Sequence, residues 1–300
     1  MTIPYFDAHC DTVSALLNEG GKLYNNGFHL DLRRLGAYSP SAQIFAVWGG
    51  KYEEKAELLR SELIENADKA VLCRSATEAR LAADCGKIAA FLSVEGAEQL
   101  DCSPERLRQV HERDGVIMVN LCWNSDNALC GAALDGGGGL TDAGRAFVST
   151  AQEIGVVTDL SHASERTFWD VISQTNRPVV ASHSNLKSLC PNPRNLTDAQ
   201  FKALIACGGG AGLNLCPSFL GVLPDVNACV AHIEAFLELG GGHSLFIGAD
   251  LDGIESLPRG MKDVESIALI YEALLRRNHG EELLRDIFYN NLMNILERAT

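Results

Sequence analysis

The sequence predicts a (β/α)8 barrel, in which eight parallel strands form a ring surrounded by helices. Eight short apolar runs recur along the 300 residues, and segments with helical periodicity lie between them. No low-complexity linker and no change of composition divides the chain, so we expect residues 1–300 to form one domain.

The predicted strands are short, and several are apolar on successive residues, as in parallel strands that are covered on both faces. The seventh is the weakest prediction because its run begins among glycines, in CGGGAGL. In chain order the eight runs are 4–9, 43–48, 88–94, 116–121, 156–160, 178–183, 210–215 and 244–250.

The predicted helices alternate with these strands, and several carry terminal signals. Thr141 and Ser164 suit the N-cap position, and Gly155 and Gly240 suit helix ends. The helical segments are 53–71, 104–114, 141–155, 164–175, 198–207, 226–240, 263–278 and 281–298.

Composition excludes several functional classes. The formal net charge is -14 and no Lys/Arg cluster occurs, so we expect neither nucleic acid nor an anionic membrane as a partner. No apolar stretch approaches the ~20 residues that span a bilayer. The N-terminus has no signal-peptide pattern, which predicts a cytoplasmic protein. The 10 cysteines include no C-x-x-C pair, which predicts reduced thiols rather than a thiolate zinc site.

Polar residues lie at the carboxyl ends of five of the predicted strands. The carboxyl ends of barrel strands meet at one rim, where the active sites of such barrels lie. His9 and Asp11 are two residues apart, so in extended chain both side chains point to the same side. The set consists of His9, Asp11, Glu95, His162, His183 and Asp250.

Each member has a structural alternative when taken alone. A single histidine at a strand end is often a hydrogen-bonded structural residue, and a single aspartate often caps the next helix. Three imidazoles and three carboxylates at one rim instead favour a divalent metal that accepts nitrogen and oxygen ligands, with Zn2+ as the first choice. Five ligands exceed what one catalytic zinc needs, whereas two ions that share a bridging carboxylate use them all.

An ordered set of motifs resembles the membrane (renal-type) dipeptidases, peptidase family M19 of the amidohydrolase superfamily. The resemblance spans nearly the whole chain, and the H-x-D pair, in place of H-x-H, separates this family from most of its relatives. The motifs are H-x-D at 9–11, V-E-G around Glu95, GGLTDAGR at 138–145, DLSH ending at His162, SHSN at 182–185, PRN at 193–195 and GADLDG at 248–253.

The resemblance implies a zinc-dependent dipeptidase with two Zn2+ ions and a bridging hydroxide. It implies that His9 and Asp11 bind the first zinc, that Glu95 bridges both ions, and that His162 and His183 bind the second. The implied substrates are small dipeptides, including L-Xaa-D-Xaa. Homodimers are common in the family, so a homodimer is one expected state.

The resemblance also implies roles outside the ligand set. Asp250 would move the proton to the leaving amine, and Arg194 would hold the dipeptide's terminal carboxylate with its planar, permanently charged fork. In VIMVNLCWNSDN, Trp123 stands where some members carry a substrate-binding histidine. Trp123 and Asn124 are therefore expected to line the substrate pocket, with core packing as the alternative.

Two other functions stay open at this point. The same metal chemistry serves other small amides, lactams and phosphoesters, although a phosphoester would favour more cations near the site than Arg194 and Arg259. A non-catalytic metal-binding relative would usually lack a ligand or the acid/base residue. All six candidates are present here.

Overall fold

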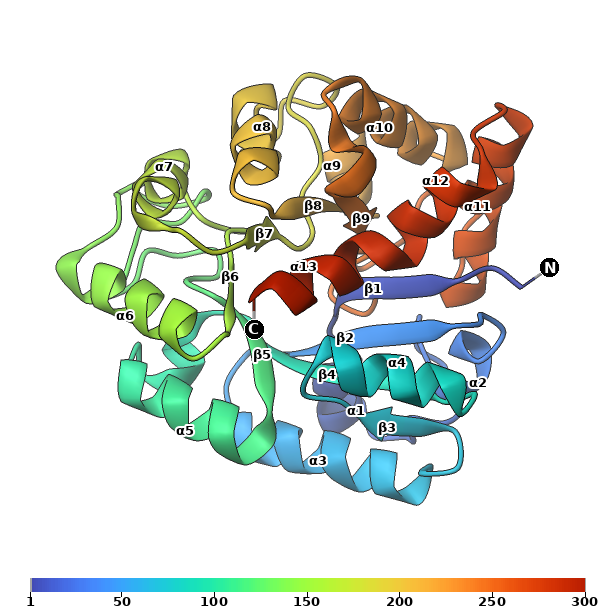
Figure 1. The fold of residues 1–300 in the computed structure, drawn as a ribbon, viewed down its shortest axis with the longest axis horizontal. Coiled ribbons are helices and arrows are strands. Elements are labelled where there is room, and N and C mark those ends of the chain that lie inside the picture. The colour runs from blue at the N-terminus through green and yellow to red at the C-terminus, as the bar shows by residue number, and fades with distance from the viewer. Residues whose placement is uncertain (1, 300) are drawn as a thin grey trace.

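The structure is a computed structural model, and it describes residues 2–299. Nine parallel strands occur in that range, and eight of them close into a barrel with helices around it (Figure 1). The strands are β1 Tyr5–Cys10, β2 Ser41–Val47, β3 Ala70–Leu72, β4 Ile88–Val94, β5 Val116–Asn120, β6 Val157–Asp159, β7 Val179–Ala181, β8 Gly210–Leu213 and β9 Leu245–Ile247.

The barrel closes where β2 pairs with β4, in parallel register from Ala42↔Ala89 to Val47↔Val94. The ring order is therefore β1, β2, β4, β5, β6, β7, β8 and β9, and β3 pairs with the outer edge of β4. All eight predicted runs are confirmed as the eight barrel strands.

The helices form the outer layer and the connections of the barrel (Figure 1). They are α1 Thr12–Glu19, α2 Leu32–Leu35, α3 Tyr52–Glu65, α4 Ala76–Asp84, α5 Pro104–Asp114, α6 Asp142–Glu153, α7 Glu165–Gln174, α8 Asp198–Ala206, α9 Pro217–Leu220, α10 Val226–Glu238, α11 Ile267–Arg276, α12 Glu281–Arg285 and α13 Asn291–Ala299. Single turns complete the list: 3-10 helices at Ala97–Leu100, Gly241–His243 and Val264–Ser266, and a π turn at Asp286–Asn290.

The predicted helix starts are confirmed by their caps. The Thr141 hydroxyl accepts from the Gly144 N–H, and the Ser164 hydroxyl accepts from the Thr167 N–H, both at 3.0 Å. One predicted helix is wrong at its end, because α3 stops at Glu65 and the apolar residues that follow form β3. Four further helices, α1, α2, α4 and α9, were not predicted from the sequence.

The glycines that weakened the seventh strand have a packing role. A Cβ atom on Gly210 would collide with the Ser244 carbonyl oxygen, and one on Gly212 would collide with that of Ser182. The backbones of the neighbouring strands therefore approach β8 so closely at these two positions that only glycine, which has no Cβ atom, can be accommodated.

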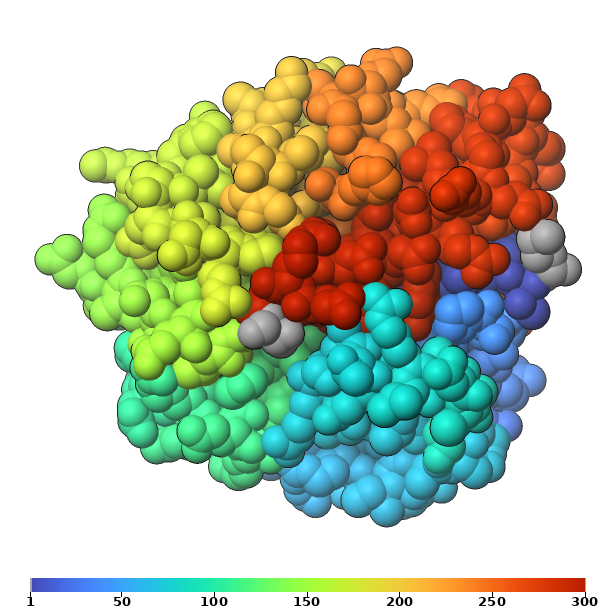
Figure 2. All heavy atoms as spheres, in the orientation of Figure 1, coloured from blue at the N-terminus to red at the C-terminus, as the bar shows by residue number. Residues whose placement is uncertain are grey.

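The barrel interior and the C-terminal segment share one apolar cluster. Phe6 in β1 stacks on Phe91 in β4, and the Tyr289 ring lies 6.0 Å from the Phe6 ring. Leu292 and Ile295 of α13 belong to the same buried cluster. In the view of Figures 1 and 2, α13 and the segment before it lie across the centre of the barrel and cover the end at which the strands begin. The other end, where the strands finish, is not covered by these helices.

Candidate active site

The six predicted polar residues meet at the carboxyl end of the barrel. All six side chains are buried, with exposed fractions from 1% for His9 and His183 to 8% for Asp250. Asp11, Glu95, His162 and Asp250 line a cavity of about 320 Å³ at this end. The barrel topology therefore confirms the predicted clustering of these residues.

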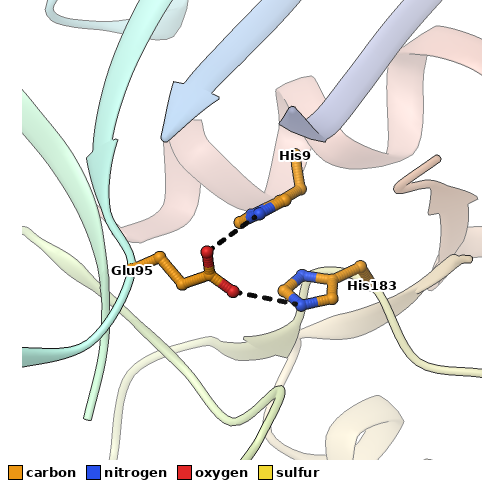
Figure 3. A group of neighbouring side chains, drawn as sticks. All are labelled: His9, Glu95 and His183. Carbon is orange, nitrogen blue, oxygen red and sulfur yellow. Dashed lines mark ion pairs between the residues drawn. The ribbon is translucent and has the colours of Figure 1, made fainter. Parts of the chain in front are cut away.

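Glu95, which follows β4, points one carboxylate oxygen at each of two groups of ligands. Its Oε2 lies 3.5 Å from His9 Nε2, and that nitrogen lies 3.4 Å from Asp11 Oδ2. Its Oε1 lies 2.9 Å from His162 Nε2 and 3.7 Å from His183 Nε2. Figure 3 shows one oxygen directed at His9 and the other at His183, whose ring centres lie 4.1 Å apart. This division is what a carboxylate shared by two cations requires.

The tautomer of His162 follows from its neighbour. His162 Nδ1 lies 2.8 Å from Asn124 Oδ1, and an amide oxygen only accepts hydrogen bonds. Nδ1 therefore carries the proton, and Nε2 presents a lone pair to the site. Burial and the nearby Arg194 lower the pKa of His162 to about 4, so the ring is neutral near pH 7.

The tautomer of His183 is fixed through a hydroxyl. Ser182 Oγ donates to the buried Asp159 carboxylate, and it lies 2.7 Å from His183 Nδ1. The hydroxyl proton is already used, so Ser182 accepts from His183 Nδ1–H. His183 Nε2 then also presents a lone pair, and burial holds the pKa of this ring well below its usual value.

These assignments leave several unprotonated atoms facing one another. His162 Nε2 and His183 Nε2 lie 2.9 Å apart with no proton between them, and Glu95 Oε1 faces both. In the part of the chain that the structure describes, the buried atoms His9 Nε2 and Asp11 Oδ1 have no hydrogen-bond partner. The lone pairs of His162, His183 and Glu95 that converge in this buried site need a cation. Although burial opposes the shift, Glu95 and Asp11 raise the pKa of His9 well above its usual value, so the site attracts positive charge and fits divalent metal ions.

Asp250 lies beside this group and has the properties of an acid/base residue. Burial raises the pKa of its carboxyl group to about 7, with His9 opposing and Asp11 and Glu95 adding to the rise. One of its oxygens accepts from Asn214 Nδ2 at 3.0 Å, which orients the group. A carboxyl group that titrates near neutral pH can both take and return a proton.

Two site residues adopt an uncommon backbone conformation. The φ angles of His162 and Asp250 are +73° and +63°, in the left-handed region. This conformation costs about 1–3 kcal/mol for a residue other than glycine. The fold therefore holds both residues where their side chains face the site.

Arg194 lines the same cavity, on the loop between β7 and α8. Its side chain is buried, and its guanidinium group lies 5.6 Å from the centre of the Phe219 ring. Within residues 2–299 this guanidinium has no hydrogen-bond or ion-pair partner. A buried cation without a partner is suited to bind an anionic group of a ligand.

The cavity wall contains predicted residues and one that the sequence analysis missed. Trp123 and Asn124 both line it, as predicted, but the Asn124 oxygen is bonded to His162. Trp48 was missed, although it directly follows β2; its ring centre lies 4.9 Å from that of Trp123. Asp252 is used structurally, since it accepts from Thr12 Oγ1 at 2.6 Å. Cys10 points into the outer core, away from the ligands.

Comparison with known proteins agrees with this geometry. Residues 1–300 match the sequence model of the family described as membrane dipeptidase (peptidase family M19). The chain belongs to the membrane dipeptidase family, M19. As a member of M19 it is a metallo-dipeptidase, built on the TIM barrel of that family.

Three relatives illustrate the M19 similarity. A metallo peptidase from Rhodobacter sphaeroides, liganded with a phosphinate mimic of the dipeptide L-Ala-D-Ala, superposes with a TM-score of 0.90 at 26% identity over 100% of both chains. An uncharacterised protein of Klebsiella pneumoniae is 28% identical over 82% of this chain and 95% of its own length. An uncharacterised dipeptidase of Schizosaccharomyces pombe is 30% identical over 69% of this chain, a match that spans 52% of the yeast protein.

The location and assembly of this M19 protein are separate questions. None of the helices described within residues 2–299 is both long and apolar enough to cross a bilayer. The one-domain organisation, the cytoplasmic location and the homodimer stay predictions.

Proposed function

We propose that the protein is a zinc-dependent dipeptidase with two Zn2+ ions, acting on small dipeptides that include L-Xaa-D-Xaa. The observation that carries this proposal is the division of the two Glu95 oxygens between His9 with Asp11 and the His162–His183 pair. A single-ion site would not need a carboxylate that faces two groups of ligands.

The ligand roles follow from that division. His9 and Asp11 would hold one ion, His162 and His183 the other, and Glu95 both. When bound, the two ions would polarise the scissile carbonyl and activate a water molecule.

Asp250 and Arg194 would supply the remaining chemistry. Asp250 would accept the proton of the attacking water and deliver it to the departing amine, because it lies beside the candidate ligands and its carboxyl group is oriented by Asn214. Arg194 would form a paired hydrogen bond with the terminal carboxylate of the dipeptide. The burial of Arg194 strengthens such a contact, because little solvent competes for the guanidinium.

The substrate class is supported by the composition of the cavity wall and by one relative. Among the described residues that line this cavity, Arg194 is the only lysine or arginine, which suits one carboxylate better than a phosphoester. The ligand of the Rhodobacter protein mimics L-Ala-D-Ala, which supports acceptance of a D-residue at the C-terminal position.

The test is hydrolysis of L-Xaa-D-Xaa and L-Xaa-L-Xaa dipeptides by purified protein, with metal content measured on the same sample. We expect about two zinc ions per chain, loss of turnover with a chelator, and recovery with zinc. Two bound ions without turnover of any dipeptide would refute the substrate class. If protein that has been incubated with zinc retains no metal, the ligand assignment is refuted.

A further inference from the structure

We propose that the preferred dipeptides carry a long cationic side chain, lysine or arginine, on their N-terminal residue. This side chain would lie along the indole rings of Trp48 and Trp123 and pair with Glu19 at the rim of the cavity. The inference rests on the proposed dipeptidase function and names the substrate class of that same site.

The ring order of the strands sets the direction of the bound dipeptide. Trp48 directly follows β2, and Arg194 lies on the loop after β7, a strand that is four positions away in the ring of eight and therefore opposite β2. Glu95 follows β4, His162 follows β6 and His9 lies in β1, and these strands stand between β2 and β7 around the ring. A dipeptide with its carboxylate on Arg194 and its amide at the metal ligands must extend its N-terminal residue towards Trp48.

The aromatic wall is held firmly and has an open face. The Trp48 carbonyl accepts from Ser14 Oγ at 3.3 Å and from the buried Lys55 ammonium group. The Trp48 and Trp123 rings lie 4.9 Å apart at 54°, and both residues are only partly buried. Indole faces attract ammonium and guanidinium groups, and this attraction strengthens when solvent is partly excluded.

Glu19 supplies the charge at the end of this wall. Ala15 and Glu19 both line the cavity, and they are four residues apart in α1, so they share one helix face. In the described part of the chain the Glu19 carboxylate has no hydrogen-bond or ion-pair partner. Asp252, also in the wall, is already bonded to Thr12.

The position of Glu19 favours a long side chain. Glu19 lies eight residues beyond Asp11, and helical rise makes this about 12 Å along α1. An extended lysine side chain reaches about 6 Å from its Cα, and a glutamate reaches back by about 4 Å. A lysine or arginine whose backbone lies near Asp11 can therefore meet Glu19, whereas an alanine stops far short.

The charge balance of the wall selects against an acidic side chain. Within residues 2–299, Arg194 is the only lysine or arginine that lines the cavity, and the proposed function assigns it to the substrate carboxylate. Lys55 sits behind Trp48 with a side chain only 2% exposed, so it does not face the substrate. A glutamate at the N-terminal position of the dipeptide would meet Glu19 with no cation to offset it.

The test compares kcat/KM for dipeptides that differ only in the N-terminal residue: lysine, norleucine, phenylalanine, alanine and glutamate. The C-terminal residue is alanine, in the enantiomer that the enzyme hydrolyses faster. Norleucine matches the length of lysine without its charge. We expect lysine to exceed norleucine by about tenfold at low salt, glutamate to be slowest, and the lysine preference to shrink as salt rises.

Two variants locate the effect. Glu19→Gln should reduce the lysine-to-norleucine ratio by about three- to fivefold, whereas the exposed Glu272→Gln in α11 should leave the ratio unchanged. Trp48→Leu should reduce kcat/KM for both long side chains relative to alanine. Far-UV circular dichroism and Tm confirm that each variant is folded.

The outcomes separate the two proposals. Hydrolysis of dipeptides with a ratio near one, a preference for norleucine, phenylalanine or glutamate, or a ratio that survives Glu19→Gln would overturn this inference alone. No hydrolysis of any dipeptide by metal-loaded protein would overturn the proposed function and this inference with it.

Discussion

Asn124 Oδ1 accepts a hydrogen bond from His162 Nδ1 across 2.8 Å, so an amide in the cavity wall fixes the tautomer of a candidate metal ligand. Such partners hold a ligating imidazole in orientation and raise its basicity. This contact gives Asn124 a positioning role besides the substrate contact expected from sequence.

The two roles of Asn124 predict different results. If it positions His162, Asn124→Ala should weaken zinc binding by about 10- to 100-fold, and Asn124→Asp, which keeps an acceptor, should restore much of it. Zinc titration with a competing chelator measures this, with the exposed Asn176→Ala as the control. A higher KM with unchanged zinc affinity would instead assign Asn124 to substrate alone.

Glu95→Gln tests the bridge between the two ligand groups. The amide keeps the shape of the side chain but removes one negative charge and offers one oxygen in place of two. We expect zinc content to fall below two per chain and kcat to fall by about 10³-fold or more. Glu272→Gln on the surface should change neither. Full zinc occupancy with normal turnover would show that Glu95 does not bridge the ions.

Arg194→Lys tests carboxylate recognition. Lysine keeps the charge but loses the planar fork, so KM for dipeptides should rise by about tenfold or more, with a smaller effect on kcat. The matched control is Arg259→Lys, whose side chain is 67% exposed. Dipeptide amides, which lack the carboxylate, should respond little to Arg194→Lys. An equal loss on acids and amides would show that Arg194 does not bind that carboxylate.

Much of the fold and the clustering of the six candidate residues could be predicted from the sequence, because both depend on local patterns. Barrel strands appear in the sequence as apolar runs, and the candidate side chains follow them directly, as Asp11 and Glu95 do. The helix end at Glu65 was missed because the short β3 has the apolar composition of a continuing helix.

The contacts that orient the ligands could not be predicted in this way. Asp159 acts on His183 through Ser182, and Asn124 reaches His162 from 38 positions away. Such contacts are set by the tertiary arrangement of strand ends, which no local pattern reports. The contact between Trp48, which follows β2, and Trp123, which follows β5, could not be predicted for the same reason.

The raised pKa of Asp250 predicts how the stability of the metal-free protein depends on pH. Burial raises the pKa of this carboxyl group from 3.8 to about 7 in the folded state. Between these values the folded state binds more protons than the unfolded state, so Asp250 lowers stability as pH rises from about 4 to about 7. Above pH 7 the cost is at most about 4 kcal/mol, at about 1.4 kcal/mol for each pKa unit.

Asp250→Asn removes this cost because an amide stays neutral. In the presence of chelator, we expect the variant and the wild type to have similar Tm values near pH 4, and the variant to be more stable by several degrees at pH 8. The control is Asp84→Asn, an exposed carboxylate in α4, which should show no such divergence. The same Asp250 variant should lose turnover at every pH when loaded with zinc. If the Tm difference shrinks towards pH 8, the folded protein stabilises the Asp250 carboxylate, and the pKa of this group is not raised by folding.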